Sequence, residues 1–281
     1  MRRFWVLLFL GVSLFSQTVQ VGDGSPTSTV KQTFVNAWMS NGFNLLVADP
    51  TTKVTTFGTT GLIQVFPSAT SSTVQLALVK PDTTESQNVR QVLAPMYAYY
   101  STIGVNNAGF PVFDTGNCPA ISNLPGGPTC QLQYFDKNYA LFIYTPALNG
   151  VTNIATRDPF YSKWSTLGGI QGLGPAITAE TAVTGLASSG GTAQYFSSAV
   201  VVNITSGTFS GKVIGIRGAI YALYTSLGAF PNATLGLPTG DELNIAGGKV
   251  RQSFEGGAID FDPATGTATL RPPVVSLSLN P

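Results

Sequence analysis

The sequence contains four copies of the short pattern Gln-x-Phe, and this repetition constrains the fold more than any other feature. The copies end at Phe66, Phe135, Phe196 and Phe254, so they lie roughly 60 to 70 residues apart. A single copy has no meaning. Four copies at near-regular spacing indicate a repeat protein when the sequence around them repeats as well.

An aromatic block with the spacing of a short amphipathic helix precedes each copy. Positions one, two and five of the block are apolar or aromatic, and in the last three copies an aliphatic residue follows three positions later. A glycine, which is the usual stop signal of a helix, closes each block. The blocks are residues 34–38, 96–100, 160–164 and 220–224, and the closing glycines are Gly42, Gly104, Gly168 and Gly228.

A turn rich in glycine and proline, and a second apolar run, complete the repeating unit. The turns are residues 108–111, 172–175 and 235–238, and each apolar run follows Gln-x-Phe. Glu255-Gly256-Gly257, between the two apolar runs of the fourth copy, is typical of a hairpin turn. One unit is therefore expected to be a short helix, a turn and a β-hairpin.

A unit of this size cannot bury its own aromatic face, so neighbouring units have to cover it. We predict an α+β fold in which four tandem repeats of short helix plus β-hairpin pack as a closed or curved pseudo-symmetric array. Repeat 1 is divergent and repeat 2 carries an insert with both cysteines. The expected ranges are 27–81, 82–150, 155–210 and 213–266, and 267–281 is a linker or the start of a truncated next domain.

The first residues have the layout of a secretory signal peptide. Arg2 and Arg3 precede an apolar run at 4–15, which is too short to cross a bilayer because a spanning helix needs about 20 apolar residues. We expect residues 1–18 to be removed, leaving a mature chain with no integral membrane span. The expected location is secreted, either extracellular, at the cell surface or in the periplasm.

Cys118 and Cys130 are the only cysteines, and export makes a disulfide between them the expected state. The chain-entropy relation gives such a bond a stabilising contribution of about 3 kcal/mol. A free reactive thiol is the alternative. The chain has no histidine to complete a zinc site with these cysteines, so neither a metal nor another cofactor is expected.

The charges argue against nucleic acid as a partner. Only 10% of the residues are charged, the net charge is +1, and lysines and arginines are scattered singly. A nucleic-acid groove or a polybasic membrane patch needs clustered cations.

The absence of histidine also removes most catalytic triads and the commonest general base. Asp114 lies in a hydrophobic-Asp-Thr-Gly sequence typical of aspartic proteases, but that chemistry needs a second carboxylate. Glu180 with Asp241 or Glu242 would supply the two carboxylates of a glycosidase if the turns faced each other. We predict that the chain is not an enzyme, with a carboxylate-dependent hydrolase as an alternative.

The aromatic residues of the helical blocks are expected to be core rather than a sugar-binding platform. Trp38, Tyr100, Trp164 and Tyr224 lie on the apolar stripe of their blocks. The better candidates for ligand binding follow the turns, and they are Asp114, Glu180, Asp241 and Glu242.

The fourth repeat resembles the LGFP repeat family. The resemblance lies in Leu235-Gly236-Leu237-Pro238, Glu242, Gln252-x-Phe254 and Gly256-Gly257-x-Ile259. It weakens through the third and second repeats and is poor in the first. LGFP repeats occur in exported bacterial proteins, associate with the cell envelope, carry no catalytic residues and can close into a ring.

The resemblance implies non-catalytic binding at or outside the cell envelope. The expected partner is a cell-wall polysaccharide or another envelope component. The alternative is a structural scaffold or spacer within a larger surface or adhesion protein.

Overall fold

The computed structural model describes residues 34–37, 54–67, 74–82, 88–119, 127–186, 188–228, 230 and 234–272. The expected signal peptide, Trp38 and the residues after 272 lie outside this part of the chain. Among the helices within these ranges, none is both long enough and apolar enough to span a membrane.

The described residues form four antiparallel sheets, each a meander of four consecutive strands. The first consists of β1 (Thr55–Phe57), β2 (Gly61–Pro67), β3 (Val74–Lys80) and β4 (Arg90–Leu93). The second consists of β5 (Gly116–Asn117), β6 (Thr129–Phe135), β7 (Tyr139–Leu148) and β8 (Val151–Arg157). The third consists of β9 (Thr181–Thr184), β10 (Gly190–Phe196), β11 (Ala199–Ser206) and β12 (Val213–Arg217). The fourth consists of β13 (Leu243–Ile245), β14 (Lys249–Phe254), β15 (Gly257–Asp262) and β16 (Thr267–Arg271).

Short helices precede the sheets, as the aromatic blocks predict. A helical segment at 34–37 comes before the first sheet. The other helices are α2 (Met96–Ile103), α3 (Val105–Ala108), α4 (Phe160–Thr166), α5 (Gly169–Gly172), α6 (Gly218–Ser226) and the 3-10 turn η2 (Ala246–Gly248).

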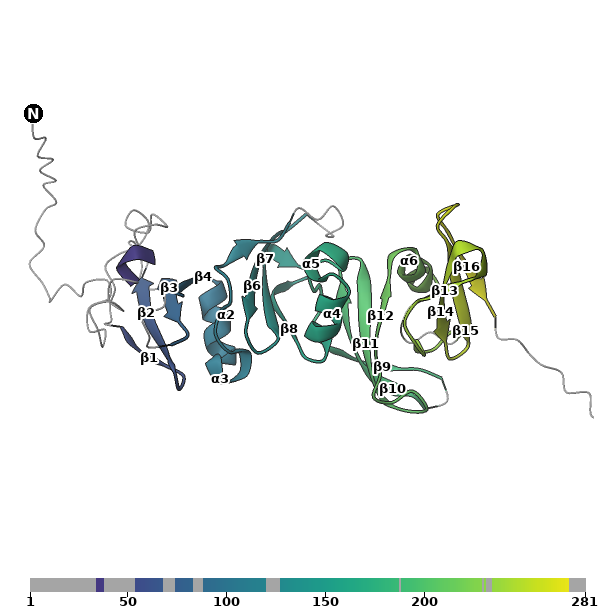
Figure 1. Ribbon diagram of the computed structural model, residues 1–281, viewed down its shortest axis with the longest axis horizontal. Helices are drawn as coiled ribbons and strands as arrows, with labels where there is room; N and C mark the ends of the chain where they lie inside the picture. The colour runs from purple at the N-terminus through teal and green to yellow at the C-terminus, as the bar shows by residue number, and fades with distance from the viewer. Residues whose placement is uncertain are drawn as a thin grey trace, which may run out of the picture.

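The four units follow one another along the long axis of the molecule, with α2, α4 and α6 lying between successive sheets (Figure 1). The described sheets therefore form an open row, and the closed alternative of the predicted array is not confirmed. The predicted helix-plus-hairpin unit is incomplete, because the Gln-x-Phe hairpin forms only the two central strands of each sheet. β4 and β12 lie within the expected range of the next repeat, and β8 starts before that range and ends within it, yet each completes the preceding sheet.

Both faces of the inner sheets are apolar, because each face packs against a different helix. Strand β7 illustrates this alternation of side chains. Leu141 and Ile143 join the cluster around α2, whereas Ala140 and Phe142 on the opposite face join the cluster around α4. A third such cluster surrounds α6, between the third and fourth sheets. Each helix is thus shared by two sheets, which ties consecutive repeats into one continuous core.

The fifth residue of the helical block explains why the repeating unit needs both its glycine and its Gln-x-Phe. Tyr100, Trp164 and Tyr224 are buried, which confirms the predicted core role for the three that the structure describes. Each ring packs against the phenylalanine of its own repeat, with centroid distances of 4.6, 6.2 and 5.0 Å respectively. Each side chain also donates a hydrogen bond to the carbonyl of the turn glycine, at 2.5, 2.8 and 3.0 Å for Gly109, Gly174 and Gly236.

These three glycines cannot carry a side chain. Their φ angles are 84°, 77° and 66°, in the left-handed region that favours glycine. A Cβ atom would collide with the residue that follows Gln-x-Phe, which is Asp136, Ser197 or Glu255. The strand pairing also shifts the expected third turn by one residue. Pro111 and Pro238 each pair with the phenylalanine of their own repeat, and in the third repeat the residue that pairs with Phe196 is Ala176 rather than Pro175.

Candidate functional site

The predicted glutamates lie at junctions between consecutive repeats, where each pairs with an arginine of the preceding sheet. Glu180 Oε1 lies 2.9 Å from Arg157 Nε, and Glu242 Oε2 lies 3.1 Å from Arg217 Nη2. The two arginines end β8 and β12, the last strands of the second and third sheets. These ion pairs therefore brace neighbouring repeats. Each is worth less than about 1 kcal/mol, because the arginines are half exposed.

The predicted aspartates also contact the preceding repeat. Asp241 Oδ2 lies 2.6 Å from Lys163 Nζ on α4. Asp114 Oδ1 accepts a hydrogen bond from the Gln91 amide of β4 at 2.8 Å. Only Asp241 and Glu242 come together, as chain neighbours, and the other candidates are distributed along the row.

The repeated glutamine is a second junction residue, which the sequence reasoning did not interpret as one. Gln194 and Gln252 are fully buried. Gln194 Nε2 donates to Ala155 O of the second sheet at 2.8 Å and to Thr178 O of its own turn at 3.2 Å. Gln252 Nε2 makes the same bridge to Gly215 O and Gly240 O, at 2.9 and 3.2 Å. The recurrence of glutamine in all four copies was the signal that pointed to this role.

Repeat 2 completes the bridge differently. The Gln133 amide donates to Phe113 O, and Thr115 Oγ1 donates to Gln133 Oε1. The corresponding Oε1 atoms of Gln194 and Gln252 have no partner among the described residues. The Asp-Thr-Gly segment is thus anchored through its threonine in the junction.

A hollow of about 290 Å³ lies on repeat 2, beside the short strand β5. Its lining residues are Phe113, Asp114, Gly116, Asn117, Leu132 and Tyr134. The Phe113 side chain is 61% exposed and meets the half-buried Tyr134 ring edge to face, with centroids 6.2 Å apart. Burial raises the pKa of Tyr134 above its ordinary value. The hollow therefore combines an apolar surface with the exposed polar side chains of Asp114 and Asn117.

Phe113 distinguishes repeat 2 from repeats 3 and 4, whereas Tyr134 has a counterpart in Tyr195 of repeat 3. The glutamine bridge places Phe113 where the third and fourth repeats have Thr178 and Gly240. Asp114 was a predicted ligand-binding residue, whereas Phe113 and Tyr134 were not singled out.

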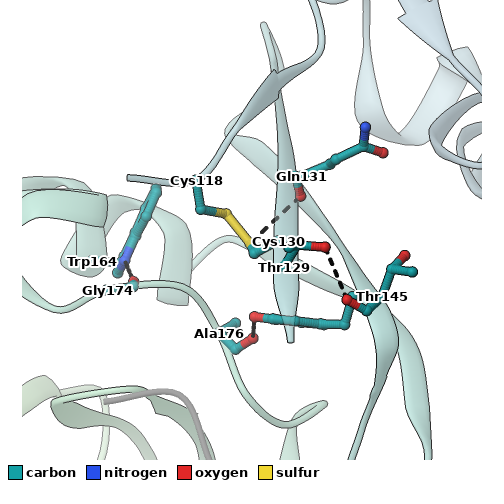
Figure 2. The surroundings of a disulfide bond; sticks show 9 residues. Cys118, Thr129, Cys130, Gln131, Thr145, Trp164, Gly174 and Ala176 are labelled. Carbon is teal, nitrogen blue, oxygen red and sulfur yellow. Dashed lines mark hydrogen bonds between the residues drawn. A yellow bond between two sulfur atoms is a disulfide. The ribbon is translucent and has the colours of Figure 1, made fainter. Parts of the chain in front are cut away.

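The predicted disulfide between Cys118 and Cys130 is confirmed, and it lies at the edge of this hollow. Cys118 directly follows the lining residue Asn117, and the backbone amide of Cys118 donates to the Cys130 carbonyl at 2.7 Å. Figure 2 shows the bond beside Trp164, whose indole donates to Gly174 O. The disulfide therefore holds β5 against β6 where repeats 2 and 3 meet.

Among the described residues, no three His, Cys, Asp or Glu side chains lie close enough together to hold a metal ion. No curated protein matches the chain significantly. The model of the LGFP repeat family matches residues 235–275, which include the Leu-Gly turn and the strands of the fourth sheet. That family is a non-catalytic repeat of bacterial surface proteins. The fourth repeat of the chain therefore matches the LGFP repeat, over residues 235–275.

Proposed function

We propose that this chain is a secreted, non-catalytic binding protein of the bacterial envelope, and that the hollow of repeat 2 binds a sugar ring of a cell-wall glycan. The observation that carries the proposal is the exposed Phe113 ring at the edge of an apolar hollow. Ligand sites are typically concave and lined by apolar and aromatic side chains with a few polar groups among them.

The chemistry of the hollow suits a neutral sugar. The C–H face of a pyranose can pack on Phe113 and Tyr134, and its hydroxyls can bond to Asp114 and Asn117. The Tyr134 ring is held by its neighbours, since it also packs against Trp164 with centroids 6.0 Å apart. Little freedom of the Tyr134 side chain is then lost on binding, which favours affinity.

A spacer role is the second candidate, and the open row of repeats favours it (Figure 1). Such a protein would hold an attached domain away from the cell wall without binding the wall itself. The hydrolase alternative is weaker, because Glu180 and Glu242 each pair with their own arginine at different junctions.

A titration of the full mature chain with purified bacterial cell-wall polysaccharide tests the proposal. Phe113→Ala is expected to weaken binding by at least about tenfold, as for an aromatic anchor. Leu243→Ala is the matched control, because Leu243 is also a large apolar side chain, 66% exposed, but lies on repeat 4. Its affinity should remain that of the native chain.

Equal loss in both variants would assign the effect to general surface hydrophobicity and reject the hollow as the site. Absence of saturable binding across several wall glycans would favour the spacer role. A ligand role for Glu180, Asp241 and Glu242 is a separate proposal. Glu180→Gln tests it in the same titration, with weaker binding expected if the carboxylate contacts the glycan.

A further inference from the structure

The outer face of the fourth sheet breaks the pattern of the other three. In the first three sheets, this face packs against the helix of the next repeat. Strand pairing identifies the equivalent positions in the fourth sheet. Arg251 occupies the position of Ile63, Leu132 and Ala193 in the first, second and third sheets. Asp260 occupies the position of Val79, Phe142 and Val202 in the same sheets. Arg271 occupies the position of Val92, Thr156 and Ile216.

A polar outer face is what the terminal unit of a repeat array requires. Ser253 and Thr269, which lie on the same face, would meet that need alone. Asp260 is not a simple polar surface residue, because its side chain is only 6% exposed. Burying a carboxylate is costly unless it is paired and hydrogen-bonded. A cap by itself therefore does not account for Asp260.

Asp260 instead holds two guanidinium groups in place. Arg251 donates from Nε to Oδ1 at 2.6 Å and from Nη2 to Oδ2 at 2.9 Å. Arg271 donates from Nε to Oδ2 at 3.1 Å. The other N–H groups of both arginines have no partner among the described residues, and the two side chains are 42% and 53% exposed. One carboxylate thus fixes two cations and neutralises only one of them.

A hollow of about 560 Å³ lies against this pair. Arg251, Arg271 and Ser253 are among the residues that line it. The arginines can only donate hydrogen bonds, whereas the serine hydroxyl can donate or accept one. Glu255 lines it as well and adds a negative charge, and its Oε2 accepts the backbone amides of Leu186 and Leu237, at 2.6 and 2.8 Å. The donors left for a ligand are the guanidinium N–H groups that Asp260 does not engage and the Ser253 hydroxyl.

We propose that this hollow binds an oxyanion, either a uronic acid carboxylate or a phosphodiester, carried by an acidic polysaccharide. Guanidinium groups suit both, because their planar N–H pairs match two oxygens at once. The arginines are already oriented by Asp260, so an anion does not have to order them. This site is separate from the repeat 2 hollow and does not depend on sugar binding there.

Arginine Nε–H signals in nuclear magnetic resonance spectra of the full chain provide the test at low ionic strength. The probes are a galacturonic acid trimer for the carboxylate, inorganic phosphate for the phosphate, and maltotriose as the neutral control. We expect Arg251 and Arg271 to shift saturably with at least one anion and not with maltotriose. Arg157 and Arg217 are internal controls, since both are half exposed and ion-paired.

Arg271→Gln should lower the affinity at least tenfold, and Arg157→Gln should leave it unchanged. The anion that shifts the signals identifies the source of the oxyanion. Joint shifts of all four arginines with one affinity would reveal general ionic attraction and overturn the proposal. A lack of saturable shifts with either anion would overturn it as well.

Discussion

The two faces of the fourth sheet belong to the same four strands but differ in the chemistry of their side chains. The inner face contributes Phe254 and Ile259 to the core around α6. The outer face carries Arg251, Asp260 and Arg271 at positions that are mostly apolar in the inner sheets. The strands form in both environments, so the face chemistry decides whether another repeat can stack.

The largest effect on the free energy of unfolding is expected when an outer-face residue type is placed at the equivalent inner position. Val202 is fully buried at the junction of repeats 3 and 4 and corresponds to Asp260 on the outer face. Val202→Asp places an unpaired carboxylate in the core and should cost at least about 3–5 kcal/mol of the free energy of unfolding. Urea denaturation followed by circular dichroism measures it.

Asp260→Val is the reciprocal change and the control. It should leave the fold nearly intact, because both released arginines are half exposed, while the more apolar outer face promotes self-association. Analytical ultracentrifugation detects that association. Equal destabilisation by the two substitutions would contradict the assignment of an inner and an outer face.

The disulfide gives the next largest expected effect, because it belongs to an inner junction. Cys130 lies in the core cluster that joins repeats 2 and 3. Replacing both cysteines by serine removes the constraint on the loop between them, and the chain-entropy relation gives a loss of about 3 kcal/mol. The thermal midpoint under non-reducing conditions measures it, with the reduced native chain as the control. A double variant as stable as the oxidised chain would rule out a stabilising role.

A single hydroxyl on the inner face should have a smaller effect. Tyr224 Oη donates to Gly236 O in the core, and burial raises the pKa of Tyr224 well above its ordinary value. Tyr224→Phe keeps the stacked ring but leaves the carbonyl without this donor, which costs about 1–3 kcal/mol. Tyr221→Phe on the same helix is the control, because Tyr221 is only partly buried. Similar losses in denaturant unfolding would argue against a special role for the Gly236 bond.

The sequence alone was sufficient for the repeating core. The fifth aromatic residue, the turn glycine and the Gln-x-Phe phenylalanine recur together because they touch one another in the fold. The outer strands were harder to predict from the sequence. For example, β8 (Val151–Arg157) mixes threonine and asparagine with apolar residues and overlaps the start of the next expected repeat. The shape of the row depends on how two sheets sit across one shared helix, which no local pattern encodes.

The candidate site was predictable only in part. Asp114 stood out through its Asp-Thr-Gly sequence, and the cysteines through their number. The direction of the neighbouring Phe113 side chain depends on the insert and on the bridge from Gln133, which become evident only in three dimensions. The four turn acids share a place in the repeat and were predicted together, but the arginine partners of Glu180 and Glu242 lie 23 and 25 residues earlier, beyond the reach of local patterns.

The pH dependence of stability should give the smallest effect and comes from the outer face. Hydrogen bonds from Arg251, and then from Arg271, hold the pKa of Asp260 below its ordinary value, although desolvation opposes them. A lowered folded-state pKa means that the stabilisation is present above the unfolded value of about 3.9 and is lost as the pH falls through the folded value. The stability difference between the native chain and Asp260→Asn should therefore be constant above about pH 5 and shrink below about pH 4. Urea midpoints from pH 7 to pH 2 measure it, and the effect is small because solvent screens both half-exposed arginines. A difference that stays constant down to pH 2 would mean that the Asp260 charge does not hold the arginines, leaving the outer face a plain polar cap.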